Sequence, residues 1–209
     1  MTEKQHRERR NFSSFDTKAA MLELGLTELQ EWDLQPSPLV LSDFFRERQK
    51  RLKGFDLTSN GSAKELLIDA VFEEILTYHD SLKIWKGAHL QSTTLTGTAD
   101  YLVAPRRRYV STPLVCVAEA KRDDFEQGLA QCLMEMKVCR EQNARDGIAI
   151  DIYGIVTNGE GWKFYRLKLD GEVWESALFS TLRMSEVLGA VNYIFAACST
   201  SITDGHKNH

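Results

Sequence analysis

The sequence predicts an α/β fold on three observations. Apolar residues recur at helical spacing in the first part of the chain, and from Leu82 onward the pattern changes to short runs typical of strands. Leu114–Ala118 is a continuous apolar run, as expected for a strand covered on both faces. Short connections join the predicted strands and helices, which favours one sheet with helices packed against it.

The N-terminal part is expected to be a helical extension over residues 1–60. Thr17–Leu26 and Thr27–Trp32 carry helix-like patterns, and prolines 36 and 38 interrupt them. Ser42 is a preferred N-cap residue and predicts a helix from there to about Leu52. That helix is rich in arginine and lysine, so it is either a solvated basic surface or a contact for DNA.

The predicted core begins at the Asn60-Gly61 turn. Ser62 and Glu65 fit a capping box, and a helix is expected from there to about Tyr78. Next come predicted strands at Lys83–Leu90, Thr94–Ala104 and Leu114–Lys121, a helix at Phe125–Gln142 capped by Asp123 or Asp124, strands at Ile148–Val156 and Trp162–Lys168, a hairpin turn at Asp170-Gly171 leading into Val173–Phe179, and a helix at Ser185–Cys198. Residues 199–209 are polar and are expected to form a flexible tail.

The composition is that of a globular protein with a real core. Of the 209 residues, 43% are hydrophobic and 27% are charged, and the formal net charge is −4. An acidic chain is unlike a binder that relies on overall positive charge, so local clusters of basic residues matter more. The four cysteines form no CxxC pair and are expected to be reduced core thiols. The charged N-terminus predicts no signal peptide, and the expected location is cytoplasmic.

Three charged residues stand close to the predicted Leu114–Lys121 strand. Glu119 and Lys121 end the apolar run and, being two residues apart, share one face of the strand at roughly 7 Å. Asp100 lies on the strand before it. Charged side chains at the end of a buried strand are costly unless they are paired or bound. The pattern therefore indicates a site formed by these three residues.

The chemistry of this set suits a hard divalent cation. The carboxylates of Asp100 and Glu119 and the backbone carbonyl of Ala120 are oxygen ligands, which Mg²⁺ or Mn²⁺ prefers together with water and substrate phosphate oxygens. Lys121 would lie beside the metal-bound water, where it could orient or deprotonate it. Such a site could hydrolyse a phosphodiester.

Asp100, followed nineteen residues later by Glu119-Ala120-Lys121, resembles the signature of the PD-(D/E)XK nuclease superfamily. This resemblance implies a restriction-endonuclease-like core of the order αβββαβ within residues 61–198, with a C-terminal hairpin and helix added. It also implies roles for Glu65, the acid on the first core helix, and for Gln131, the glutamine near the metal site. Glu65 could join through water or a second metal, and Gln131 could support the lysine or the metal.

The sequence departs from the family pattern at two positions. Ala99 stands before Asp100 where the family name has proline, and Glu135 stands four residues after Gln131 where some relatives have tyrosine. Each singled-out residue also has a structural interpretation. Glu119 and Lys121 could be a plain ion pair, Glu65 a capping residue, and the arginines near the site a solvated loop; these are Arg106, Arg107, Arg108 and Arg122.

The expected function is metal-dependent hydrolysis of phosphodiester bonds in nucleic acid, with Mg²⁺ or Mn²⁺ as cofactor. DNA is the expected substrate. One alternative is a catalytically inactive protein of the same fold that binds nucleic acid or regulates a partner. Another is an interaction module in which the helices before Ser62 bind a partner. A homodimer would suit an enzyme that cuts both strands, and the sequence leaves this open.

Overall fold

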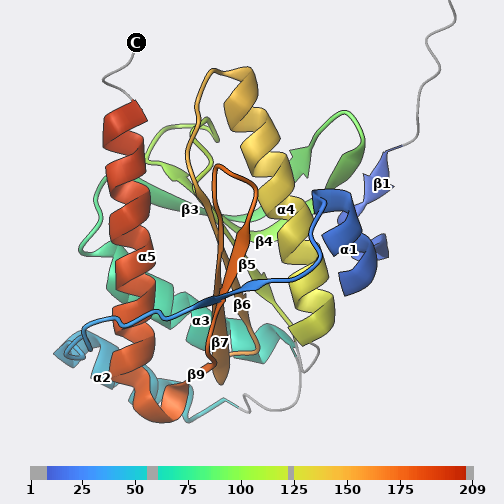
Figure 1. Ribbon diagram of the computed structural model, residues 1–209. Coiled ribbons are helices and arrows are strands. Elements are labelled where there is room, and N and C mark those ends of the chain that lie inside the picture. The colour runs from blue at the N-terminus through green and yellow to red at the C-terminus, as the bar shows by residue number, and fades with distance from the viewer. Residues whose placement is uncertain (1–8, 56–60, 122–124, 206–209) are drawn as a thin grey trace, which may run out of the picture.

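The structure is a computed structural model that describes residues 9–55, 61–121 and 125–205. It is an α/β arrangement in which one mixed sheet lies between helices (Figure 1). Within the described residues the sheet has nine strands, in the order β1-β4-β5-β6-β7-β8-β2, with β3 paired to β4 and β9 paired to β7.

The elements have the following bounds. The helices are α1 (Thr17–Leu24), α2 (Asp43–Leu52), α3 (Gly61–Leu76), α4 (Phe125–Arg145) and α5 (Met184–Gly205), with short 3-10 turns η1 (Phe12–Ser14) and η2 (Thr181–Arg183). The strands are β1 (Arg10–Asn11), β2 (Gln30–Trp32), β3 (Leu82–Gln91), β4 (Leu95–Pro105), β5 (Cys116–Ala120), β6 (Ile152–Thr157), β7 (Gly161–Leu167), β8 (Val173–Ser176) and β9 (Phe179–Ser180).

The centre of the sheet has the element order α3-β3-β4-β5-α4-β6. Strands β3, β4 and β5 pair antiparallel in sequence, and β5 then pairs in parallel with β6. A parallel pair needs a crossover, and α4 supplies it. Both β5 and β6 are buried along nearly their whole length, which explains the apolar runs in their sequences.

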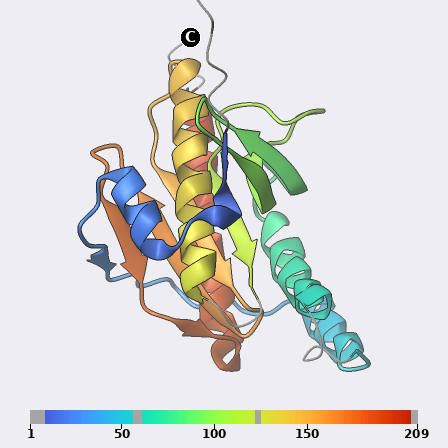
Figure 2. The ribbon, with the colours of Figure 1, turned by 90° about the vertical axis from the view of Figure 1, so that its right-hand side faces the viewer.

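Two apolar clusters hold the helices to the two faces of the sheet. One face packs α3 and α5 through residues such as Phe72 and Phe195, and the other packs α4 with η1 and α1 through residues such as Leu133 and Phe12. Figure 2 shows α4 and α1 in front of the sheet and α5 behind it. The sheet is therefore the middle layer of three.

The N-terminal segment spans the sheet from one end of its strand order to the other. Its β1 pairs in parallel with β4, and its β2 pairs in parallel with β8. Between them α1 packs against α4. The interpretation of 27–32 as helix is wrong, because Gln30–Trp32 pairs with Trp174–Ser176 and this pairing overrides the weak local helix pattern.

Most of the other predicted elements are confirmed with shifted ends, such as the strand expected from Ile148, which begins at Ile152. The strand expected over Val173–Phe179 is instead divided into β8 and β9. Ser42 caps α2, since its Oγ accepts from the Phe45 N–H at 3.0 Å, and the Asp170-Gly171 turn joins antiparallel β7 and β8. The last helix continues to Gly205, past the expected end at Cys198, so residues 199–205 are helical and not part of a flexible tail. The proposed caps at Asp123 and Asp124 lie outside the described residues, as does the side chain of Ser62, and the division of the chain near residue 60 stays a prediction.

The four cysteines are all free and buried, as expected for reduced core thiols. In the part of the chain that the structure describes, no helix has the length and apolar content required to cross a bilayer.

Asn143 is a structural link between α4 and the segment leading into β5. Its buried side chain accepts from the Leu114 N–H and donates to the Leu114 carbonyl, both at 2.8 Å. Substitution Asn143→Ala should lower the free energy of unfolding by roughly 2–4 kcal/mol, because two buried backbone groups lose their partner. Urea denaturation measures this loss. Gln142→Ala, which removes one exposed hydrogen bond to Gln91, should cost far less, and equal losses would contradict this role of Asn143.

Candidate active site

Asp100 and Glu119 lie where the ladder between β4 and β5 ends. The last backbone pair is Tyr101 with Ala118, and beyond it side chains take over the bonding. The Ala120 N–H donates to Asp100 Oδ2 at 2.9 Å, and the Asp100 N–H donates to Glu119 Oε1 at 3.3 Å. Each carboxylate is thus held by the backbone of the opposite strand.

A change of face in β3 and β4 brings Asp100 to this position. Ala99 and Tyr101 would share a face in a regular strand, yet Ala99 packs on the α4 side and Tyr101 on the α3 and α5 side. In the neighbouring strand the same change occurs around Gly87, whose φ is +62°. A residue other than glycine rarely adopts this conformation. The irregularity places Asp100 at the level of Glu119, near the end of β5.

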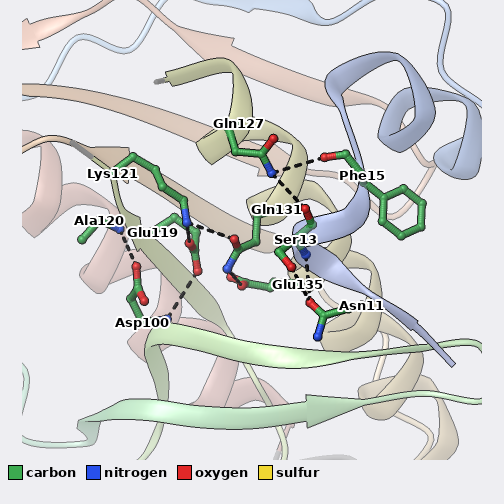
Figure 3. Close-up of polar contacts among 10 residues, drawn as sticks. All are labelled: Asn11, Ser13, Phe15, Asp100, Glu119, Ala120, Lys121, Gln127, Gln131 and Glu135. Carbon is green, nitrogen blue, oxygen red and sulfur yellow. Dashed lines mark hydrogen bonds and ion pairs between the residues drawn. The ribbon is translucent and has the colours of Figure 1, made fainter. Parts of the chain in front are cut away.

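A continuous chain of polar contacts connects β5 to α4 (Figure 3). Lys121 Nζ lies 3.0 Å from Glu119 Oε2 as an ion pair and donates to Gln131 Oε1 at 3.0 Å. Gln131 Nε2 in turn donates to Glu135 Oε1 at 3.1 Å. The structure therefore brings together four of the five predicted site residues, Asp100, Glu119, Lys121 and Gln131, and adds Glu135.

Gly128 allows α4 to approach the site closely. A Cβ atom at this position would lie 2.6 Å from Val156 Cγ1 and 3.0 Å from Lys121 Cγ. Such contacts are too short for a real side chain, so glycine lets the lysine stem pass between α4 and the sheet. The ammonium group of Lys121 is thereby directed toward Glu119 and Gln131.

Two of the three acids of the site are withdrawn from water, whereas Asp100 is half-buried. Glu119 and Glu135 have no exposed surface, and Gln131 is 8% exposed. Burial raises the pKa of Glu135 well above its ordinary value, and the neighbouring charge of Glu119 raises it further. Burial also raises the pKa of Glu119, although its contacts with Glu135 and Lys121 partly oppose the shift.

A proton held between Glu119 and Glu135 explains these shifts. One oxygen of each acid, Oε2, is buried without a hydrogen-bond partner, although Lys121 is near one of them as an ion pair. Two buried carboxylates in contact cannot both be charged at low cost, and one proton satisfies both. The pKa of both acids is raised, so the buried pair favours holding one proton between its two carboxyl groups.

Lys121 remains charged in this environment. Burial by itself lowers its pKa, but the charges of Glu119, Asp100 and Glu135 and the contact with Glu119 outweigh burial and leave the pKa raised. The ammonium group is therefore a fixed positive charge rather than a proton acceptor.

The donor set fits a magnesium or manganese ion. Asp100, Glu119 and Glu135 place three acids beside one lysine. With one proton shared by Glu119 and Glu135, two negative charges face one ammonium group, and a divalent cation would offset this excess. Among the residues described, no three histidine, cysteine, aspartate or glutamate side chains are grouped as ready-made metal ligands. Mg²⁺ does not need such a cage, since one or two carboxylates with water and substrate oxygens suffice.

Glu65 is not part of the connected chain around Lys121. Its carboxylate forms an ion pair with Lys86 of β3 at 3.4 Å, and Asp69, one turn later on α3, also pairs with Lys86 at 2.9 Å. Asp69 additionally accepts from the Tyr101 hydroxyl at 2.9 Å, next to Asp100. A role for Glu65 in the site stays a prediction.

The structure separates the arginine loop from the site. Arg106, Arg107 and Arg108 follow the end of β4 at Pro105, which pairs with Leu82, whereas Asp100 lies toward the other end of that strand. β5 begins opposite Val103 and extends away from this loop to Ala120. The three arginines are therefore at the opposite end of β5 from Lys121, and Arg122 lies outside the described residues.

The N-terminal segment approaches the site end of α4. Gln127, one turn before Gln131, donates to the carbonyl groups of Ser13 at 3.4 Å and Phe15 at 3.3 Å (Figure 3). The Thr17 hydroxyl donates to the Glu126 carbonyl at 3.0 Å. These contacts fix the first turns of α4, and with them the position of Gln131.

Glu135 is the site residue that sequence reasoning missed. Its position four residues after Gln131 on a helix predicts that the two share a face, and this spacing was the available signal. The sequence could not show that this face turns toward Glu119.

Comparison with known proteins adds a local similarity. No protein-family model matches the chain. Crinkler effector protein 5 from Phytophthora infestans is 44% identical to the chain over 52 residues. This stretch covers 25% of the chain and 14% of that relative. The chain thus corresponds to a small part of the relative's length.

The shared proton predicts a dependence of stability on pH. A carboxyl group with a raised pKa in the folded state contributes stability at low pH, and this contribution is lost as pH rises from the ordinary value near ~4.3 through the raised value. Glu135→Gln keeps the shape but cannot ionise. In the presence of chelator its melting temperature should fall less than that of the wild type between about pH 5 and pH 8.

Glu160→Gln is the control for this comparison, because Glu160 is exposed and its charge faces solvent. This control should follow the wild-type pH profile. A Glu135→Gln profile that also matches the wild type would contradict a raised pKa at Glu135.

Proposed function

We propose that the protein is a metal-dependent nuclease of the PD-(D/E)XK type with a restriction-endonuclease-like core. The observation that carries the proposal is the joining of Asp100, Glu119, Lys121 and Gln131 at the end of β5 by contacts of 2.9–3.3 Å. The element order α3-β3-β4-β5-α4-β6 supports it as well. DNA is the proposed substrate.

The reaction is hydrolysis of a phosphodiester. Water attacks phosphorus and a new P–O bond forms while the bond to the leaving oxygen breaks. The attacking water releases one proton to solvent and the leaving oxygen takes one up, so the step balances. The charged ammonium of Lys121 orients the attacking water and offsets negative charge on the phosphate. Gln131 holds Lys121 by its carbonyl oxygen and is held in turn by Glu135, so the lysine has a defined direction.

Asp100, Glu119 and the Ala120 carbonyl are the proposed ligands of Mg²⁺ or Mn²⁺. When bound, the ion would polarise the phosphate and lower the pKa of water. The raised pKa of Lys121 makes the amine a poor proton acceptor, so its proposed role is to orient water and not to deprotonate it.

Complete burial of Glu119 favours a second candidate function. Its carboxylate is already bonded by the Asp100 N–H and paired with Lys121, which also contacts Gln131. A site closed in this way suits a catalytically inactive protein of the same fold that binds nucleic acid or regulates a partner. Metal binding separates the two candidates.

Lys121→Ala should lower the cleavage rate by about 100-fold or more while the chain remains folded, because the water loses its positioning charge. The assay incubates circular and linear, single- and double-stranded DNA and RNA with Mg²⁺ or Mn²⁺, and in parallel with chelator. Lys163→Ala is a matched control, since Lys163 is a half-buried lysine that pairs with Glu175 on another part of the sheet. Full activity of Lys121→Ala would overturn the mechanism.

Calorimetric titration with Mg²⁺ tests the proposed ligands. The wild type should bind the ion, and Asp100→Asn should bind it at least about tenfold more weakly, because a carboxylate ligand becomes a neutral amide. Equal heats for the two proteins, together with no cleavage by the wild type, would favour the inactive alternative.

A further inference from the structure

Positive charge is concentrated on α2 although the whole chain is acidic. Between Ser42 and Phe55 the sequence contains five lysine or arginine residues and two acids, whereas the net charge of the chain is −4. Two of the five cations have acidic partners. Arg48 pairs with Glu73 at 3.4 Å, and Arg51 pairs with Glu47 at 3.0 Å.

The remaining three cations share one side of the helix. Arg46, Lys50 and Lys53 are spaced by four and three residues, which places them on one face, and all three are exposed. They line a groove of about 540 Å³, together with Gln49, Leu52 and Leu67. Among the residues that the structure describes, no acidic side chain lines the groove, which has a basic rim and an apolar floor formed by Leu52 and Leu67.

Helix α3 connects this groove to the candidate site. Leu67 lines the groove, while Glu65 and Asp69, on the opposite side of the same helix, pair with Lys86 beside the strand that carries Asp100. An α-helix is about 10 Å across, and this width separates the groove from the strands. Figure 2 shows α2 beside the end of α3.

The first turns of α3 also lie near the end of β6. A Cβ atom at Gly159, in the turn after β6, would be 3.4 Å from Lys64 Cβ. β6 ends at Thr157, which pairs with Ala120. The α2 groove is thus on the side of the molecule toward which the site end of β5 points, in contrast to the arginine loop at the other end.

We propose that the α2 groove binds the sugar-phosphate backbone of the nucleic acid on one side of the reacting phosphodiester. This inference rests on the proposed function. Adjacent nucleotides rise by about 3.4 Å along a duplex strand, so one helix width corresponds to roughly three nucleotides. Arg46, Lys50 and Lys53 contact phosphates, and such contacts position the substrate without reading its sequence.

The test is binding of a fluorescent DNA duplex, followed by anisotropy in chelator so that no cleavage occurs. The variant Arg46→Gln/Lys50→Gln/Lys53→Gln should bind about tenfold or more weakly, and the slope of log affinity against log salt should fall by about 2–3 between ~50 and ~200 mM salt. Its melting temperature should match that of the wild type, since all three side chains are exposed.

Arg106→Gln/Arg107→Gln/Arg108→Gln is the matched control, because it removes the same charge from the far end of β5. It should bind within about twofold of the wild type. Equal weakening by both triple variants would overturn the inference in favour of a general charge effect. An unchanged affinity of the α2 variant for DNA would overturn the inference directly. Binding of both proteins to anionic lipid vesicles is measured in parallel. If the three substitutions abolish vesicle binding and leave DNA binding intact, the inference is also overturned.

Cleavage by the wild type is scored separately. A chain that binds DNA through α2 but does not cut it would keep this inference and overturn the proposed function. If the wild type cuts DNA and the α2 variant binds DNA as strongly as the wild type, the proposed function stands and this inference is overturned. A wild type that neither binds nor cuts DNA would overturn both.

Discussion

Burial of the Glu119 carboxylate constrains the arrangement around it, because a charged group without exposed surface must be bonded or neutralised. The Asp100 N–H, the Lys121 ammonium and the Glu135 carboxyl meet this requirement from β4, β5 and α4. The buried position of Glu119 therefore depends on all three elements. The same contacts fix the direction of Lys121, so structural stability and chemical preorganisation depend on one set of interactions.

Local patterns in the sequence were enough to locate much of this core. The apolar run into Glu119, the strand before it and the amphipathic helix after it all lie where expected, because burial on a sheet or helix face leaves a periodic signal. The connection of Asp100 to Glu119 followed from pairing of consecutive strands. Gln131 followed from the resemblance to a nuclease family, and the structure brings it into contact with Lys121.

Other features depend on partners that no local pattern reveals. Gln30–Trp32 becomes a strand because β8, far along the chain, offers a free edge. The change of face at Ala99 and Tyr101 breaks the period of two that sequence reasoning assumes, and Gly87 in the adjacent strand gave no distinct signal. The position of Glu135 opposite Glu119 requires knowledge of how α4 lies on the sheet.

The N-terminal segment joins the two ends of the strand order, with β1 on β4 and β2 on β8, and crosses α4 through α1. This segment, residues 10–32, acts as a strap across the sheet. Its two pairing strands, β1 and β2, are both remote in sequence from β4 and β8, with which they pair. The pairing of β2 requires β8 at Val173–Ser176, so the strap cannot close without the C-terminal part of the chain. Closing the strap therefore joins segments far apart in sequence, which carries a high cost in chain entropy. Loosening it at residues 13–17 would free the first turns of α4, on which the position of Gln131 depends.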